Sequence, residues 1–162
     1  MTAYATLESP IGPLLITADD GALSRLYMAP FAIDPAWAND PGALAEPAHQ
    51  LSEYFAGERT EFELELAPAG TGFQQRVWAL LRGIPYGETT TYGALANALG
   101  NPRSVRAVGL ANGRNPISIV VPCHRVIGAD GSLVGYGGGI ERKRTLLAHE
   151  AEVVAGFRAT LW

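Results

Sequence analysis

A short segment, Ala67-Pro68-Ala69-Gly70, divides the sequence into two parts of opposite charge. Residues 1–70 carry eleven acidic and two basic side chains, whereas residues 71–162 carry five acidic and ten basic ones. Proline and glycine in so short a stretch interrupt helices and strands and are typical of a linker. The sequence therefore predicts two small domains, residues 1–68 and 71–162, of which the basic one suits a polyanion. Chance segregation of charged faces is the alternative.

The composition is that of a folded protein, since 48% of the residues are apolar and 17% are charged. No apolar run reaches the roughly 18 residues that a membrane span needs. The N-terminal residues lack the basic start and apolar stretch of a signal peptide. A single cysteine excludes an internal disulfide and a multi-cysteine zinc site. We therefore expect a cytoplasmic protein without a membrane partner, a metal or a cofactor.

The first part has the pattern of a small α/β domain. Two strand-like runs, Leu14–Ala18 and Ala22–Tyr27, flank Asp19-Asp20-Gly21, which is typical of a tight hairpin turn. Apolar residues at helical spacing predict a helix over Ala43–Ala56, and alternation of Glu with apolar residues predicts a strand over Glu61–Leu66. No catalytic residue types gather in this part, so we interpret it as a support.

The second part begins with helices. Thr71, with Gln74 three residues later, has the pattern of a capping box at a helix start. Further along, apolar residues at helical spacing predict a helix over Tyr92–Leu99, and Gly100-Asn101-Pro102 separates it from a second helix. In that second helix we expect an inward face of Val105, Val108 and Gly109 and an exposed side with Arg103, Arg106 and Arg114.

Two short helices across a tight turn, with arginines on the second, fit a DNA-binding helix-turn-helix. Any helical hairpin can show the same pattern, so the pattern alone leaves both interpretations open. The basic charge of residues 71–162 favours the DNA-binding interpretation.

The only cysteine, Cys123, follows an apolar run, Ile117–Val121, that we interpret as a buried strand. His124 and Arg125 come directly after it, and nearby positive charge favours the nucleophilic thiolate. A buried cysteine at a strand end is the alternative. Adjacent residues of an extended chain point to opposite sides, so His124 would need a turn or a bridging water to reach the thiol.

A final helix is predicted over Glu141–Glu150, and one face of it carries Lys143, Leu146, Leu147 and Glu150. Glu150 on this inward face is either half of a salt bridge or a carboxylate that orients the histidine. The glycine-rich loop Gly131–Gly139 before the helix lacks the lysine and spacing of a phosphate-binding loop.

Together these motifs resemble the O6-alkylguanine-DNA alkyltransferases, or methylated-DNA–protein-cysteine methyltransferases, of the single-function bacterial type. The active-site signature is Pro122-Cys123-His124-Arg125-Val126. Other blocks follow in family order: Ser9–Leu14, Phe73–Trp78, Ile84–Gly87, Thr91–Gly93, Arg106–Gly109, Asn112–Pro116, Gly135–Gly139 and Leu146–Glu150. The resemblance implies a ribonuclease H-like α/β domain followed by a helical domain with a winged helix-turn-helix.

The resemblance also implies roles for individual residues. Cys123 would accept the alkyl group, His124 would take its proton through a water, and Glu150 would orient His124. Asn115 would tie the helix-turn-helix to the cysteine loop, and the Tyr92 hydroxyl would donate to the flipped guanine.

Further implied roles concern the DNA and the pocket. Arg106 would fill the space left by the flipped base, on a DNA-binding surface shared with Tyr92, Ala107 and Arg114. The alkylguanine pocket would be formed by Tyr136, Gly137, Val126 and Lys143. The carbonyls of Cys123 and Val126 would accept from the guanine amino group. Many relatives have serine where this chain has Gly137, which puts a hydroxyl contact in doubt.

The implied function is irreversible, stoichiometric transfer of the alkyl group from O6-alkylguanine, and from O4-alkylthymine, in duplex DNA to Cys123. The reacting carbon is hidden in the duplex, so the base must leave the stack at a cost of roughly a few kcal/mol. A thioether has no easy leaving group, so the protein, which we expect to be a monomer, acts once. The alternatives are a cysteine-dependent hydrolase or acyltransferase and a non-catalytic binder of alkylated bases. The alkyl range and cooperativity on DNA stay open.

Overall fold

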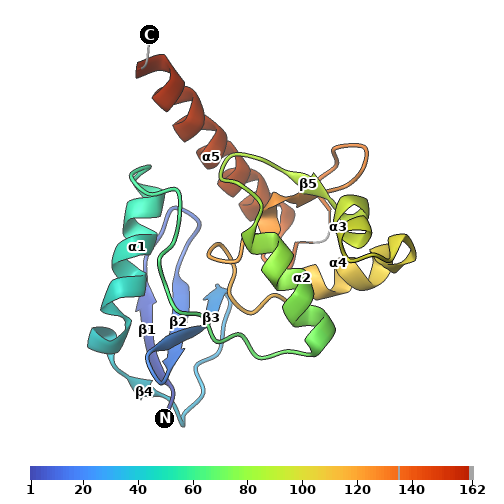
Figure 1. Ribbon diagram of the computed structural model, residues 1–162. Helices are drawn as coiled ribbons and strands as arrows, with labels where there is room; N and C mark the ends of the chain where they lie inside the picture. The colour runs from blue at the N-terminus through green and yellow to red at the C-terminus, as the bar shows by residue number, and fades with distance from the viewer. Residues whose placement is uncertain (135, 161–162) are drawn as a thin grey trace. The chain divides into compact units, whose positions relative to one another are not determined.

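The structure is a computed structural model that describes residues 1–134 and 136–160, with the backbone alone for residues 157–160. It contains two compact units (Figure 1). The first unit comprises residues 1–69 and the short segment Pro116–Ser118, and the second comprises residues 70–115 and the chain from residue 119 onward. Strands dominate the first unit and helices the second, which confirms the mixed α/β class predicted from the sequence.

The first unit is built on a four-stranded sheet in the order β3-β2-β1-β4. β1 pairs antiparallel with β2, β2 pairs antiparallel with β3, and β4 runs parallel to β1. The strands span Ala3–Leu7, Leu14–Asp19, Ala22–Met28 and Ala38–Asn39, from β1 to β4. The predicted hairpin is confirmed: Asp20 and Gly21 join β2 to β3 with φ values of 49° and 82°. Positive φ at both positions matches the twist of the flanking strands.

One helix accompanies this sheet. A 3-10 turn, η1 (Pro41–Leu44), leads into α1 (Ala45–Phe55; Figure 1). Leu51 and Tyr54 of α1 are buried. The predicted helix over Ala43–Ala56 is therefore confirmed, with a tighter first turn. Asp40 caps this turn, because its side chain accepts from the backbone N–H of Ala43.

The predicted strand over Glu61–Leu66 is wrong. Only Leu66 forms a bridge, with Leu23 of β3. The middle of the segment bonds to a side chain instead: the Gln50 amide of α1 donates to the Glu63 carbonyl and accepts from the Glu63 N–H, at 3.2 and 2.9 Å. A glutamine side chain thus satisfies the backbone groups that a neighbouring strand would otherwise pair with.

The second unit starts with α2 (Gly72–Arg82), and its predicted capping box is present. The Gln74 N–H donates to the Thr71 hydroxyl at 3.1 Å, and the Thr71 N–H donates to the Gln74 side chain at 2.9 Å. Trp78 is buried on this helix, and its indole N–H donates to the Ala111 carbonyl at 2.9 Å. Because Ala111 belongs to α4, this bond ties α2 to the helix pair.

The predicted helix pair consists of α3 (Tyr92–Ala98) and α4 (Val105–Gly113), with a 3-10 turn, η2 (Pro102–Ser104), between them. Val105 is 41% exposed, so its predicted inward position is wrong. The 3-10 turn rotates the start of α4, and the buried face begins at Val108 and continues with Ala111 and Asn112. The predicted exposure of Arg103, Arg106 and Arg114 is confirmed.

The segment after α4 differs from the sequence prediction. Ile117–Val121 is not a strand: Ile117 makes a single bridge to Leu26, and the chain then turns, with a φ of 72° at Ile119. Cys123 stands in a 3-10 turn, η3 (Cys123–Arg125), so the expected extended chain at this point is also wrong.

Two short strands lie before and after the helix pair in the chain. β5 (Thr90–Thr91) and β6 (Val126–Ile127) pair in parallel. The last helix, α5 (Ile140–Thr160), is longer than predicted, and its buried face carries Lys143, Leu146 and Glu150 as expected. Gly135 of the predicted loop lies outside the described residues.

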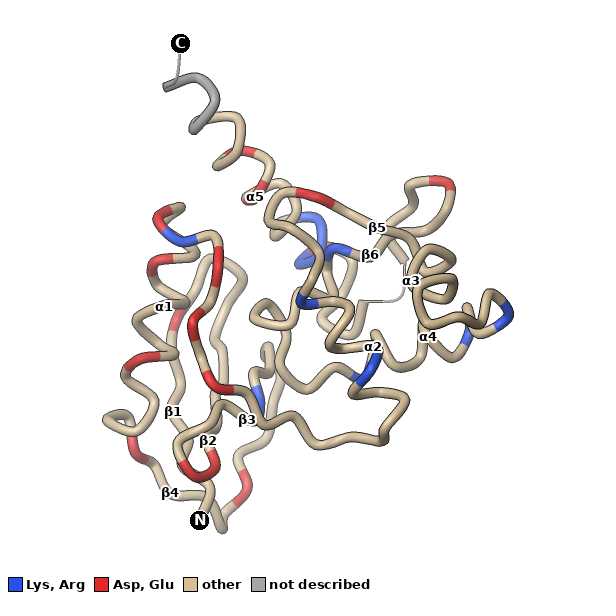
Figure 2. Tube along the Cα trace, in the orientation of Figure 1, with Lys and Arg blue, Asp and Glu red and all other residues tan. Residues whose placement is uncertain are grey.

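The charges separate by unit (Figure 2). Acidic residues follow α1 and the segment after it, and basic residues lie on α2, around α4 and at the start of α5. Within the described part of the chain, no helix is both long and apolar enough to cross a membrane.

Candidate active site

Cys123 is buried, with 4% of its surface exposed, at the first position of η3. Two amides from the end of α4 hold this turn. The Asn115 side chain donates to the Val121 carbonyl at 2.8 Å, and the Asn112 side chain donates to the Cys123 carbonyl at 3.4 Å. Asn112 lies in the last turn of α4 and Asn115 follows the helix, so the end of α4 is fixed to the cysteine loop.

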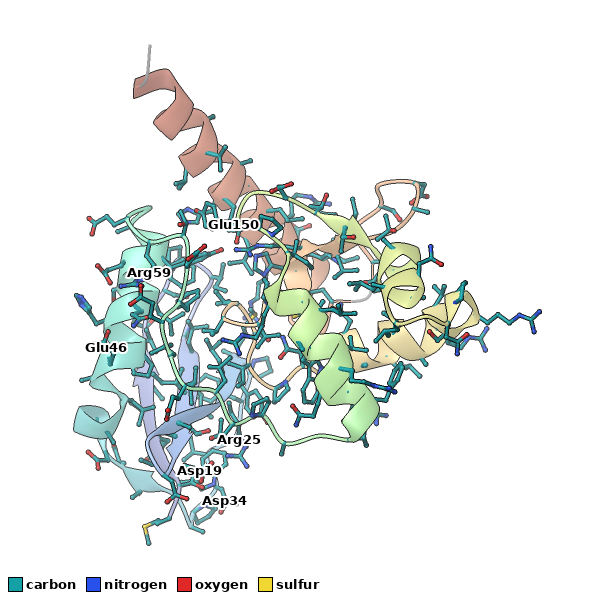
Figure 3. The ribbon with its side chains drawn as sticks, viewed as in Figure 1. Asp19, Arg25, Asp34, Glu46, Arg59 and Glu150 are labelled. Carbon is teal, nitrogen blue, oxygen red and sulfur yellow. The ribbon has the colours of Figure 1, made fainter. Side chains whose placement is uncertain are left out.

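The 3-10 turn directs His124 toward α5. The His124 side chain is fully buried, and its Nε2 lies 2.7 Å from Oε2 of Glu150 (labelled in Figure 3). The backbone of the turn is closed by a hydrogen bond of 3.0 Å from the Arg125 N–H to the Pro122 carbonyl. The structure thus brings together His124 and Glu150, two of the site residues predicted from the sequence.

Among the described residues, Glu150 accepts hydrogen bonds from His124, Arg125 and Gly87. Oε2 accepts from His124 at 2.7 Å and from Arg125 Nη2 at 3.0 Å. Oε1 accepts from Arg125 Nε at 2.8 Å and from the Gly87 N–H at 3.2 Å. A buried carboxylate is stable as an anion only when it is paired and hydrogen-bonded, and this arrangement supplies both conditions.

The protonation states follow from these contacts. Burial alone would raise the pKa of Glu150, but the hydrogen bonds and charges of His124 and Arg125 outweigh burial and hold the pKa far below its usual range. Burial lowers the pKa of His124 below 6.5, against the hydrogen bond and charge of Glu150 that would raise it. His124 is therefore neutral near pH 7. Because Glu150 is an anion, Nε2 carries the proton and Nδ1 keeps a lone pair.

The Nδ1 atom of His124 has no hydrogen-bond partner among the described residues. An unpartnered buried acceptor on a neutral imidazole is suited to take a proton, directly or through a water. The group next to it in the chain is the thiol of Cys123. The arrangement is therefore chemically able to generate a thiolate.

Lys143 of α5 is fully buried beside this turn. Its ammonium donates to the carbonyls of Val126 and Val134, and it lies 6.0 Å from the ring centres of both Tyr92 and Tyr136. Burial lowers the pKa of Lys143, while the charge of Cys123 opposes that shift. A cation held here would stabilise negative charge on the sulfur or on a nearby ligand.

Tyr92, the first residue of α3, donates its hydroxyl to the Val134 carbonyl at 2.8 Å. Burial raises the pKa of Tyr92, the charge of Cys123 raises it further, and a hydrogen bond with Asn112 acts in the opposite direction. Tyr92 and Lys143 therefore share one acceptor, the Val134 carbonyl. Because Cys123 contributes to the electrostatics of both, the predicted pocket residues Tyr92 and Lys143 gather around the cysteine.

The remaining predicted residues lie on the surface or at its margin. Arg106, Ala107 and Arg114 are exposed on or next to α4. Tyr136 is 9% exposed, and Gly137 is exposed. A Cβ atom added at Gly137 would lie 3.3 Å from the Gly113 carbonyl, so a side chain there would be in tight contact with the end of α4.

Sequence reasoning missed two site residues. From the sequence, Arg125 is only a positive charge near Cys123, whereas in the structure it binds both oxygens of Glu150. Asn112 received no role of its own, although it is 1% exposed, bonds to the Cys123 carbonyl, and leaves its Oδ1 without a partner among the described residues. Its place four residues after Val108 and three after Gly109 puts it on the inward face of the predicted helix, which is a signal for a buried polar residue.

No group of three or more His, Cys, Asp or Glu side chains in the described part of the chain is arranged to hold a metal ion. The chemistry available at this site is that of a thiol, a neutral imidazole, an ionised carboxylate and two cations.

Comparisons with known proteins agree over most of the chain. Residues 2–68 match the ribonuclease-like domain of 6-O-methylguanine DNA methyltransferase, and residues 72–152 match its DNA binding domain. The methylated-DNA–protein-cysteine methyltransferase of Mycobacterium tuberculosis is 56% identical and covers 93% of both chains. That of Methanosarcina acetivorans is 49% identical and covers 91% of this chain and 97% of its own. The crystal structure of Mycobacterium tuberculosis OGT in complex with DNA is similar, with a TM-score of 0.89 at 55% identity and coverage of 93% and 94%.

Proposed function

Because the chain belongs to the 6-O-methylguanine DNA methyltransferase family, we propose that it repairs alkylated DNA by direct transfer of an alkyl group to Cys123. The substrate is duplex DNA that contains O6-alkylguanine, and O4-alkylthymine is the second substrate. The observation that carries the proposal is the buried imidazole of His124, neutral and oriented by Glu150, next to the only cysteine of the chain. The names of the relatives, and the similar structure bound to DNA, support the substrate class.

The first step is removal of the proton from Cys123. In the proposed mechanism, the Nδ1 lone pair of His124 receives this proton through a water molecule, and the new imidazolium is stabilised by the anion of Glu150. Thiolate is the form of cysteine that attacks carbon, so this step sets the supply of nucleophile. Asn115 and Asn112 hold the backbone of the loop while the side chain reacts.

The second step is displacement at the alkyl carbon. A bond forms between Sγ of Cys123 and the carbon, the bond between the carbon and O6 breaks, and its electron pair passes to the guanine. Tyr92 and Lys143 stabilise that charge, Tyr92 by donating its hydroxyl to the ring and Lys143 by its positive charge. In the structure both donate to the Val134 carbonyl. Entry of the base therefore exchanges these contacts for contacts with the guanine.

The carbonyls of Cys123 and Val126 are proposed to accept from the guanine amino group. The Cys123 carbonyl already accepts from the Asn112 side chain and from the Val126 N–H, and the Val126 carbonyl accepts from Lys143. Because a carbonyl oxygen has two lone pairs, the guanine amino group would replace one of the two donors at Cys123. Tyr136 and the Gly137 backbone complete the pocket. Glycine at this position offers only its N–H, and the Gly113 carbonyl limits the space for a larger residue.

Delivery of the base requires the nucleotide to leave the duplex, at a cost of roughly a few kcal/mol. We propose that α3 and α4 form the winged helix-turn-helix that binds the DNA, with Arg106, Ala107 and Arg114 on its surface. Arg106 occupies the space of the flipped base, where a guanidinium can stack and bind phosphates. Asn115 connects this DNA-binding element to the cysteine loop.

The product is a thioether, which has no easy leaving group, so the reaction consumes the protein. We propose that the protein acts as a monomer in the cytoplasm, where the thiol stays reduced. A hydrolase or acyltransferase with the same residues would turn over many substrates. A non-catalytic binder would leave the lesion unchanged.

Titration separates the three functions. Increasing amounts of protein are incubated to completion with a fixed amount of a duplex that contains one O6-methylguanine, and the remaining lesion is quantified. Direct transfer predicts that the number of lesions lost rises in proportion to the amount of protein added, with one lesion lost per protein molecule, until no lesion is left. Loss of many lesions per molecule would indicate a turnover enzyme. Binding without loss of the lesion would identify a non-catalytic binder. A Cys123→Ser variant, which lacks the thiol, is the control for that outcome.

A further inference from the structure

Arg125 is an arginine in a position where a surface cation would not be expected. It is 6% exposed, and its guanidinium makes three hydrogen bonds. Nε and Nη2 donate to the two oxygens of Glu150 at 2.8 and 3.0 Å, and Nη1 donates to the Ile84 carbonyl at 2.8 Å. Its charge also lies 5.4 Å from the ring centre of Tyr86. The Arg125 side chain is therefore held by Glu150 of α5 and by Ile84 in the segment that follows α2.

The two bonds to Glu150 determine the orientation of the carboxylate. Arg125 supplies one donor to each oxygen, beside the Gly87 N–H at Oε1, at 3.2 Å, and His124 at Oε2. A planar fork that binds both oxygens fixes the plane of the carboxylate, which a single point donor does not. Because His124 is held by Oε2, the direction of its ring follows from that plane.

The charge of Arg125 also acts on His124, in the same direction as burial, which is the larger cause of the lowered pKa. The charged groups that act on His124 are Glu150 and Lys143 from α5 and Arg125 from η3, and Tyr86 lies next to Arg125 and Glu150. Glu150 favours the protonated imidazole, whereas Arg125 and Lys143 oppose it. A histidine that is already protonated cannot accept the proton of the thiol.

We propose that Arg125 is a positioning residue for the base: through both oxygens of Glu150, it fixes the His124 ring and keeps it neutral with the Nδ1 lone pair available. The alkyl-transfer part of this inference rests on the proposed function, whereas the state of the histidine can be measured without DNA. The proposal separates two contributions, the charge of the guanidinium and its two-pronged geometry.

The first measurement follows the three histidines of the protein by NMR during a pH titration, with a His124→Gln variant for assignment. In Arg125→Met, which removes the charge, the pKa of His124 should rise by about one to three units, as is typical when a charge at close range is lost. In Arg125→Lys, which keeps the charge, the pKa should stay near that of the wild type. Arg144→Met is the matched control, because Arg144 pairs with Glu141 on the exposed side of α5, the helix that carries Glu150.

The second measurement is the rate of alkyl transfer against pH. As the pH is lowered, Arg125→Met should lose activity at a higher pH than the wild type does, because its His124 becomes protonated at a higher pH. Arg125→Lys should be slower by roughly 10- to 100-fold at every pH, because a single nitrogen cannot fix the carboxylate. If Arg125→Met does not fold, the Arg125→Lys variant decides. Slower alkyl transfer with an unchanged His124 titration supports the proposal. Alkyl transfer at the wild-type rate overturns it.

Wild-type titration of His124 in both variants would also overturn the proposal, even if both melt at lower temperature, since Arg125 would then be only a structural support. If the wild type transfers no alkyl group at all, the proposed function fails. The NMR titration still decides whether Arg125 controls the histidine.

Discussion

Replacing Glu150 with glutamine tests the buried ionic cluster, because the substitution keeps the shape of the side chain and removes its charge. Donors from His124, Arg125 and Gly87 converge on this carboxylate. The amide of glutamine has a single acceptor oxygen, and its NH2 group would face donors. At least one hydrogen bond to Arg125 or His124 would be lost, and the guanidinium of Arg125, with a side chain 7% exposed, would have no anion.

The magnitude follows from that lost charge. Removing one partner of a buried pair typically costs about 3–5 kcal/mol, because the remaining charge is left uncompensated in the interior. For a chain of this size, about 2–4 °C of melting temperature corresponds to 1 kcal/mol. Glu150→Gln should therefore lower the melting temperature by about 6–20 °C. The control Glu141→Gln, at an exposed pair on the same helix, should leave it unchanged.

The assay is thermal unfolding of both variants and the wild type between pH 7 and pH 3. The pKa of Glu150 is lower in the folded than in the unfolded state, so its contribution is present above about 4.5 and is lost as the pH falls toward the folded-state value. The difference between the wild type and Glu150→Gln should therefore narrow below pH 4.5. A melting temperature within 2 °C of the wild type, or a difference that does not depend on pH, would refute the ionic cluster as described.

Three further predictions concern the base, the DNA contact and the fold. Because burial lowers the pKa of His124 below 6.5, the alkyl-transfer rate should stay above half of its maximum at pH 6.5 and fall at more acidic pH; a rate already halved at 6.5 contradicts the lowered pKa. Arg106→Ala should slow repair of duplex DNA far more than reaction with the free alkylated base, and equal losses would argue against a role in base flipping. Thr71→Ala should cost about 1 kcal/mol in chemical unfolding, because it removes the capping box of α2; no change would mean that the cap is dispensable.

Local rules predicted the elements whose stability is local. The hairpin at Asp20-Gly21 and the capping box at Thr71 depend on neighbours within three residues, and the structure has both. The predicted strand over Glu61–Leu66 failed because the Gln50 side chain takes the backbone bonds of Glu63, a long-range contact that alternation does not reveal.

The cysteine region shows the same limit. Apolar character predicted that Ile117–Val121 is mostly buried, but not that it turns at Ile119 and is held by Asn115. In an extended chain Cys123 and His124 would point to opposite sides. The chain instead forms a 3-10 turn at Cys123, and His124 reaches Glu150 of α5. The family motif pointed to His124 and Glu150, whereas the grip of Arg125 on Glu150 depends on side-chain geometry that spacing alone does not contain.

The most direct test of alkyl transfer to Cys123 is the mass of the protein after reaction. The protein is incubated with an excess of duplex that contains O6-methylguanine, and its intact mass and its peptides are then measured. The account predicts one added methyl group per molecule, located on the peptide that contains Cys123, with unmodified guanine left in the DNA. An unchanged protein mass after loss of the lesion, or a methyl group on any other residue, would contradict it.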